Sequence, residues 1–212
     1  MSRFWRLVLL LLASFFVTQN ALAHPHAWID LRSRVLLNDE GQVYAFEFEW
    51  LFDDYYTVLV AEELGLGQEP TAAYLDQITK RNLTNLQDYD YFTAITYDGE
   101  RQAVGEVTRY ESDLHDGRLW MQFELPLTQP LDPKTGEVSF AVYDPTYWIE
   151  ILHLEGEPIF FSGEGADQCF GDIIQPNPTL DQVTLAAAID RDETGGDDLG
   201  ELFAETVALR CS

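Results

Sequence analysis

Two histidines one residue apart follow a short Ala-x-Ala stretch near the start of the chain. They lie in His24-Pro25-His26-Ala27-Trp28-Ile29-Asp30, directly after Ala21-Leu22-Ala23. Neutral imidazole nitrogens and carboxylate oxygens are ligands for zinc, nickel and cobalt. In an extended strand, residues 24, 26 and 30 project to one face. We therefore expect His24, His26 and Asp30 to belong to a metal site.

Proline at position 25 restricts which kind of metal site this segment can form. Cleavage after Ala23 would make His24 the first residue and add its α-amine as a nitrogen ligand. A square-planar N-terminal copper site needs a backbone N–H at the second position, and proline has none. The imidazoles must then act with the amine and with groups from elsewhere in the fold. The alternative is an ordered terminus that binds nothing.

Asp144 and His153 are the further candidates for the predicted ligand set. Asp144 opens Asp144-Pro145-Thr146, where an aspartate commonly makes a turn by bonding the backbone. His153 lies in a predicted strand and His115 in a polar turn, so an ordinary structural role stays open for each. Asp53, at the predicted start of a helix, can cap that helix.

The serines of the chain lie outside any nucleophile-elbow motif, and the chain contains no phosphate-binding loop. We therefore predict that the protein is not an enzyme. One enzymatic alternative is a copper histidine brace, in which the amine and ring of His24 and an internal histidine hold copper. A third possibility is a transporter accessory that binds no metal.

The first 23 residues have the pattern of a cleaved signal peptide. Arg3 and Arg6 precede an apolar run at residues 7–16, and Ala21-x-Ala23 is the small-residue box that a signal peptidase reads. The apolar run is shorter than the roughly 20 residues of a membrane span. We predict a periplasmic protein whose mature part, residues 24–212, is a single domain without a membrane span. An uncleaved anchor is the alternative.

The chain is strongly acidic, with a formal net charge of −25. Removal of a signal peptide that carries Arg3 and Arg6 and no acid changes this charge to −27. Nucleic-acid binding needs Lys and Arg for the phosphates, so we predict no nucleic-acid partner. A negative field attracts cations and keeps a protein soluble.

The two cysteines, Cys169 and Cys211, both lie in the C-terminal part. In an oxidising compartment we expect them to form a disulfide that ties the end of the chain to a strand near residue 169. The alternative, two thiolate metal ligands, lacks neighbouring residues at metal-ligand spacing.

Alternation of apolar and polar residues predicts a mainly β or α+β fold. Strands at 28–37 and 43–50 flank the turn Asn38-Asp39-Glu40-Gly41 and form a hairpin. Helical spacing and turn residues at about 53–90 predict a helical pair inserted after the hairpin. Further strands are expected at 93–97, 102–111, 118–126, 137–143, 147–154 and 168–174, with a helix at 179–191. The sum is an antiparallel β-sandwich or open sheet with an inserted helical pair.

Several segments resemble the domain-of-unknown-function 1007 (DUF1007) family across nearly the whole mature chain. They are His24-Pro25-His26-x-Trp28-Ile29-Asp30, Trp50-Leu51-Phe52-Asp53-Asp54-Tyr55, Asn82-Leu83-x-Asn85-Leu86-x-x-Tyr89-x-Tyr91-Phe92, Val142-Tyr143-Asp144-Pro145-Thr146-Tyr147 and the tail Leu202-Phe203-Ala204-Glu205. The resemblance implies a periplasmic component of a transport system linked to nickel/cobalt-type inner-membrane permeases. One branch, the ZevA-like proteins, is tied to zinc uptake. It thus implies zinc, nickel or cobalt as the bound metal, with copper as the alternative, and a metal permease as partner.

Overall fold

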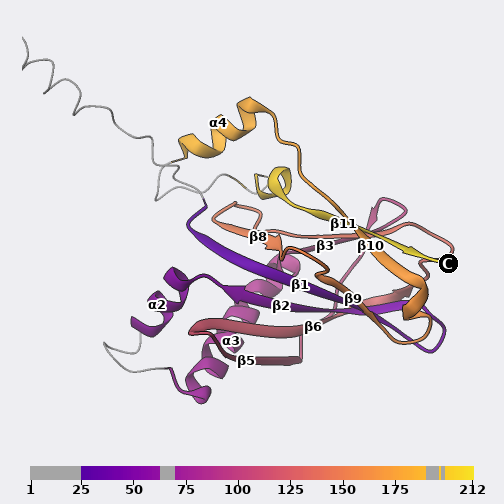
Figure 1. Cartoon of the computed structure of the whole chain (residues 1–212), viewed down its shortest axis with the longest axis horizontal. Helices are drawn as coiled ribbons and strands as arrows, with labels where there is room; N and C mark the ends of the chain where they lie inside the picture. Colours follow the sequence, from indigo (N-terminus) through magenta and orange to yellow (C-terminus); the bar gives the residue numbers. More distant parts are fainter. Residues whose placement is uncertain (1–24, 63–69, 190–195, 197–198) are drawn as a thin grey trace, which may run out of the picture.

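The computed structural model describes residues 25–62, 70–189, 196 and 199–212, in which two β-sheets and three α-helices make up the fold (Figure 1). The six-stranded sheet has the order β5-β6-β2-β1-β8, and β9 also pairs with β1. The five-stranded sheet has the order β10-β11-β7-β3-β4. The strands are β1 Ala27–Leu37, β2 Val43–Phe52, β3 Thr93–Tyr97, β4 Glu100–Arg101, β5 Arg109–His115, β6 Arg118–Leu131, β7 Val138–Val142, β8 Ile149–His153, β9 Ile159–Ser162, β10 Cys169–Ile174 and β11 Thr206–Cys211.

Strands β1 and β2 form the predicted antiparallel hairpin, with Leu31 opposite Trp50. The sheet is not purely antiparallel, however, because β8 and β9 both pair with β1 in the parallel direction. Alternation along one strand predicts which residues share a face but not which strand lies beside it. The expected fold class is confirmed as a β-rich α+β fold, and the six-stranded sheet is mixed.

The predicted helical pair lies between β2 and β3, as α2 (Asp54–Glu62) and α3 (Ala72–Leu86), followed by the 3₁₀ segment η2 (Gln87–Phe92). Thr71 caps α3 by accepting the backbone N–H of Tyr74. The third helix, α4 (Leu180–Ala188), begins with a capping box formed by Thr179 and Gln182. Within the described residues, no helix is long and apolar enough to cross a membrane.

Two predicted strands have other bounds in the structure. The segment expected at 102–111 becomes regular only at Arg109, and β5 then runs to His115. The turn after it is the pair Asp116 and Gly117, with φ values of 53° and 80°. Positive φ at both positions is the two-residue hairpin geometry that matches strand twist. The polar residues before Asp116 are therefore part of an edge strand.

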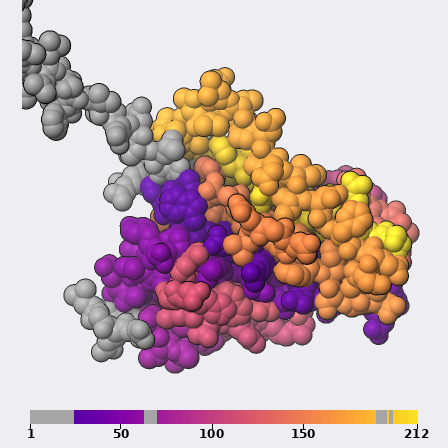
Figure 2. Space-filling model, in the orientation of Figure 1, coloured from indigo at the N-terminus to yellow at the C-terminus, as the bar shows by residue number. Residues whose placement is uncertain are grey.

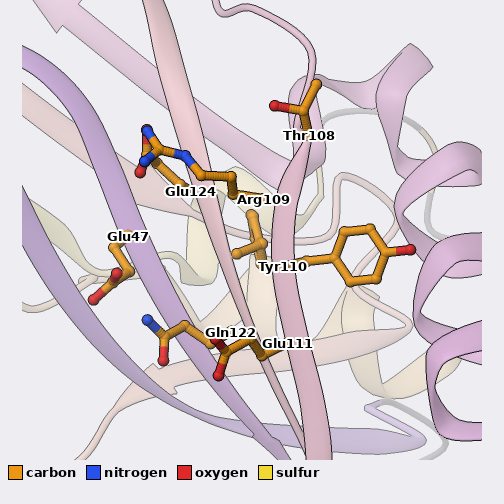
Figure 3. Close-up of a pocket in the computed structure, with 8 residues that line it drawn as sticks. Glu47, Thr108, Arg109, Tyr110, Glu111, Gln122 and Glu124 are labelled. Carbon is orange, nitrogen blue, oxygen red and sulfur yellow. The ribbon is translucent and has the colours of Figure 1, made fainter.

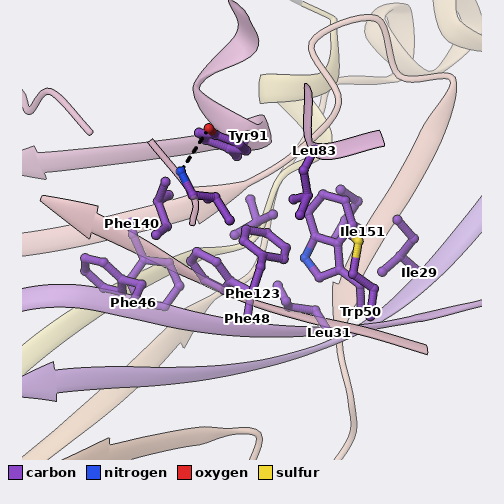
Figure 4. Close-up of a cluster of buried hydrophobic side chains, with 14 of the residues drawn as sticks. Ile29, Leu31, Phe46, Phe48, Trp50, Leu83, Tyr91, Phe123, Phe140 and Ile151 are labelled. Atoms are coloured by element: carbon purple, nitrogen blue, oxygen red, sulfur yellow. Dashed lines mark hydrogen bonds between the residues drawn. The ribbon is translucent and has the colours of Figure 1, made fainter. Parts of the chain in front are cut away.

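The core lies between the two sheets and under α3 (Figure 4). Phe46 of β2 packs against Phe140 of β7 with ring centroids 5.0 Å apart, which joins the two sheets. Leu75, Ile78 and Leu83 of α3 are also buried in this core. Burial of a large apolar side chain contributes roughly 1.5–3 kcal/mol, so these contacts hold α3 on the sheet.

A short segment before β3 has a left-handed backbone at three successive residues. Asp90, Tyr91 and Phe92 have φ values of 50°, 55° and 58°. Each such residue costs about 1–2 kcal/mol when it is not glycine. The Tyr91 hydroxyl is buried and accepts the backbone N–H of Val107 at 3.0 Å, which holds the segment in place.

The expected disulfide joins Cys169 of β10 to Cys211 of β11. The two residues are direct partners in the register of these antiparallel strands. The predicted bridge is therefore confirmed, and it fastens the last strand at the edge of the five-stranded sheet. The 3₁₀ segments η3 (Ala166–Gln168) and η4 (Gly200–Phe203) precede β10 and β11.

Candidate functional site: the N-terminal end of β1

His26 lies just before β1 and next to β8. Its backbone N–H donates to the Trp148 carbonyl at 2.9 Å, and its ring lies 5.4 Å from the Trp148 ring. The side chain is half-buried. His24 lies outside the described residues, as does the predicted signal peptide. The structure therefore fixes the position of one of the two histidines.

A carboxylate lies beside this segment on β8. Glu150 pairs with Trp28 in the parallel register, and its side chain accepts the Trp28 Nε1–H at 3.0 Å. The Tyr147 hydroxyl also donates to Glu150, at 3.3 Å. Burial, followed by the charge of Glu150 and this hydrogen bond, raises the pKa of Tyr147 to about 12. Tyr147 thus keeps its proton at neutral pH and holds the carboxylate in place.

Asp53 connects the start of β1 to helix α2. It accepts the Trp28 backbone N–H at 2.6 Å and the Tyr56 backbone N–H at 2.9 Å. The second bond satisfies a donor in the first turn of α2. The capping role weighed for Asp53 is confirmed, and the same residue also fixes where β1 begins.

Asp30 projects from the outer face of the six-stranded sheet, where its carboxylate pairs with Arg118 at 2.8 Å. It follows His26 by four residues, which in a strand is about 13 Å. Metal–ligand bonds are about 2 Å long, so the two side chains cannot hold one ion. Asp30 instead lines a surface hollow of about 180 Å³ together with His115 and Glu49. The His115 ring stacks on Trp120 at 4.5 Å.

A larger hollow of about 440 Å³ lies farther along the same outer face, over β2, β5 and β6 (Figure 3). Glu47 and Glu124 stand directly opposite each other there. Like charges in this position repel, and the repulsion is offset because Arg34 pairs with Glu47 and Arg109 with Glu124. The hollow is thus a charged surface that can attract cations weakly.

Asp144 forms the turn that leads into β8. One carboxylate oxygen accepts the backbone N–H and the hydroxyl of Thr146, and the other accepts the backbone N–H groups of Trp148 and Ile149. The side chain is 4% exposed. Four donors occupy the carboxylate, so the turn-forming role is the one that the geometry supports.

His153 lies on the inner face of the six-stranded sheet, within a buried polar network. Its Nδ1 is 2.9 Å from Glu205 and its Nε2 is 3.0 Å from the Ser33 hydroxyl. Glu205 also accepts the His153 backbone N–H and the amide of Gln175. Burial raises the pKa of Glu205, but the hydrogen bonds from His153 and Gln175 outweigh it and lower that pKa below its ordinary value.

Serine, histidine and carboxylate in this order are also the arrangement of a hydrolase triad. Ser33 is 1% exposed, however, and lies between the sheets. A substrate cannot reach its hydroxyl in this structure. The network therefore joins β1, β8 and the segment before β11 by hydrogen bonds across the core. Sequence reasoning missed it, although Ser33 is the one polar residue among the inward-facing positions of β1 and was a readable signal.

The structure does not gather the predicted ligands into one place. His26 and Asp30 lie at different points of the outer face, Asp144 is occupied in a turn, and His153 lies on the inner face. Among the described residues, no group of three or more His, Cys, Asp and Glu side chains is arranged to hold a metal ion. What remains near His26 is the carboxylate of Glu150, which sequence reasoning had not selected.

Comparison with known proteins gives a family and two uncharacterized relatives. A family model described as "Protein of unknown function (DUF1007)" matches residues 9–211. An uncharacterized protein of Haemophilus influenzae is 26% identical over 205 residues, which covers 95% of this chain and 97% of the relative. An uncharacterized 15.5 kDa protein in the trpE 3′ region of Spirochaeta aurantia is 29% identical over 85 residues, which covers 40% of this chain and 60% of the relative.

Proposed function

Because the chain belongs to the DUF1007 family of proteins of unknown function, we propose its role from its own residues. It is an exported, non-enzymatic periplasmic protein that binds a divalent transition metal, zinc first and nickel or cobalt next. It delivers that metal to an inner-membrane metal permease. The observation that carries the proposal is the pair His24 and His26, directly after a signal-peptidase box.

The contacts around His26 support a revised set of ligands, namely His24, His26 and Glu150. His26 bonds the backbone of Trp148, so Glu150, two residues further along β8, is its diagonal neighbour on the sheet. Diagonal neighbours are within reach of long side chains. Trp28 and Tyr147 donate hydrogen bonds to Glu150, and donors of this kind orient the ligating carboxylates of metal sites.

Exposed apolar side chains beside this segment support a protein partner. Tyr55, Val58 and Leu59 follow helical spacing on α2 and are 54%, 53% and 38% exposed. Trp28, 45% exposed, is joined to the start of α2 through Asp53. Indigo and purple atoms lie together at this end of the molecule in Figure 2. Contiguous exposed apolar surface marks sites of interaction with proteins.

Isothermal titration of the processed protein with zinc, nickel, cobalt and copper tests the proposal. His24→Ala and His26→Ala should each weaken zinc binding at least tenfold, or about 1.4 kcal/mol. Glu150→Gln should weaken it by a smaller factor. Imidazole must lose its proton to coordinate, and a free histidine side chain titrates near pH 6.5. The affinity should therefore fall between about pH 7.5 and pH 5.5.

Two matched histidine variants serve as controls. His115→Ala, in the outer-face hollow, and His153→Ala, on the inner face, should leave zinc affinity unchanged, although His153→Ala should lower stability. Unchanged affinity after replacement of both His24 and His26 would refute the site. Selective copper binding with peroxide-dependent turnover would favour the histidine-brace enzyme, and absence of metal binding would favour the transporter accessory.

A further inference from the structure

A small apolar cavity lies where the inner face of the six-stranded sheet meets the last turns of α3. Its volume is about 150 Å³. Trp50, Phe52, Tyr56 and Phe92 contribute aromatic rings to its wall, and Met121 adds a thioether. It is separate from the N-terminal end of β1 and from the two hollows on the outer face.

One polar atom of this wall lacks a partner. Trp50 is 1% exposed, and its Nε1–H is buried with no hydrogen-bond partner among the described residues. A buried tryptophan N–H normally finds an acceptor, because leaving it unsatisfied is costly. A molecule in the cavity that carries an acceptor would supply the missing hydrogen bond.

A strained backbone places a second part of the wall. Phe92 is the last of the three successive left-handed residues, and its ring lies 6.4 Å from the Trp50 ring at an interplanar angle of 21°. Tyr91, one residue earlier, is anchored by its bond from Val107. Such strain is found at ligand clamps, where the surrounding structure holds residues in unfavourable conformations. The strain therefore points to the same cavity as the buried donor.

The remaining groups define the charge of the occupant. No lysine, arginine, aspartate or glutamate lines the cavity. The polar residues are Tyr56, Asn82 and Asn85, and Asn82 already donates to the Tyr56 hydroxyl at 3.1 Å. An ionic ligand would have no counter-charge here, so a neutral molecule fits the site.

We propose that this cavity binds a small neutral aromatic molecule carrying one hydrogen-bond acceptor, which bonds to Trp50 Nε1. Offset or edge-on packing against the wall rings would favour an aromatic body. An apolar cavity of about this size in another protein binds benzene, so the occupant is one six-membered ring or slightly larger. A neutral nitrogen heteroaromatic ring meets these requirements. The site is independent of the proposed metal site.

The test compares pyridine with benzene, which have nearly the same shape while only pyridine has an acceptor. Both are titrated at pH 7.5 into the protein with its disulfide intact, and indole N–H resonances are followed by ¹H–¹⁵N NMR. Trp50→Phe assigns the Trp50 signal. Both probes should bind saturably, and pyridine alone should move the Trp50 N–H signal downfield. Trp50→Phe should weaken pyridine relative to benzene roughly fivefold, the weight of one neutral hydrogen bond.

A second variant keeps the test independent of the fold of Trp50→Phe. Leu86→Trp, at the half-buried rim of the cavity, should abolish binding of both probes by filling the space. Leu59→Trp, on the exposed side of α2, is its matched control and should bind as the original chain does. The proposal is overturned if neither probe binds saturably up to its solubility limit, since water alone then fills the cavity. It is also overturned if Leu86→Trp leaves binding intact, or if pyridine leaves the Trp50 signal unmoved.

Discussion

Replacing Glu205 with alanine removes the acceptor at the centre of the buried polar network. Three hydrogen bonds end on this carboxylate, from the His153 backbone N–H at 2.8 Å, from His153 Nδ1 at 2.9 Å and from the Gln175 amide at 2.7 Å. The Glu205 side chain is 8% exposed and that of His153 is 2% exposed. Water therefore cannot replace the lost acceptor without opening the core.

The expected loss of stability follows from these contacts. Each buried donor left without a partner costs about 1–3 kcal/mol, and removal of one partner from a buried charged pair typically costs about 3–5 kcal/mol. We expect Glu205→Ala to lower the free energy of unfolding by about 3–5 kcal/mol. For a domain of this size, that corresponds to a fall in Tm of roughly 6–20 °C.

Urea and thermal unfolding followed by circular dichroism measure this loss at pH 7. Glu205→Gln is the matched control, since it keeps the shape and one acceptor oxygen and should lose only about 1–2 kcal/mol. A loss below about 1 kcal/mol for Glu205→Ala would refute the network as a source of stability. A parallel fall in zinc affinity would contradict the placement of His153 away from the metal site.

The pH dependence gives an independent check on the same carboxylate. The folded-state pKa of Glu205 is lowered relative to its ordinary value of 4.5. A lowered carboxylate pKa contributes stability that is fully present above the unfolded-state pKa and is lost as the pH falls through the folded-state pKa. The stability difference between the original chain and Glu205→Gln should therefore be constant above about pH 5 and shrink below pH 4.5.

Two further predictions concern covalent and steric constraints. Cys169 and Cys211 should resist thiol labelling until they are reduced, and Cys169→Ser should lower stability by about 4 kcal/mol on the loop-entropy model; free thiols in exported protein would contradict the bridge. Gly200→Ala should destabilise by about 2–4 kcal/mol in thermal unfolding, because the added Cβ would lie 1.8 Å from the Asp144 carbonyl oxygen. Gly196→Ala meets no atom within 4 Å and should lose only the 1–2 kcal/mol of a left-handed backbone; equal losses would refute the steric reasoning.

Local patterns in the sequence determined most of the secondary structure. Strand β3 has the predicted bounds, 93–97, because alternation and the flanking Asp98-Gly99 turn define both its face and its end. Thr71 could be read as the start of α3 because a threonine hydroxyl satisfies a free N–H of the first helical turn. The disulfide was predictable because the chain has two cysteines and the signal-like N-terminus implied an oxidising compartment.

Only the tertiary structure decided which side chains meet. Shared parity suggested that His26 and Asp30 act together, but four residues of extended chain separate them by about 13 Å. The parallel pairing of β8 with β1 brought Glu150 beside Trp28 and turned His153 toward the core. Periodicity specifies the face of a strand, whereas neighbours across a sheet depend on strand order, direction and register, which packing of the whole chain selects.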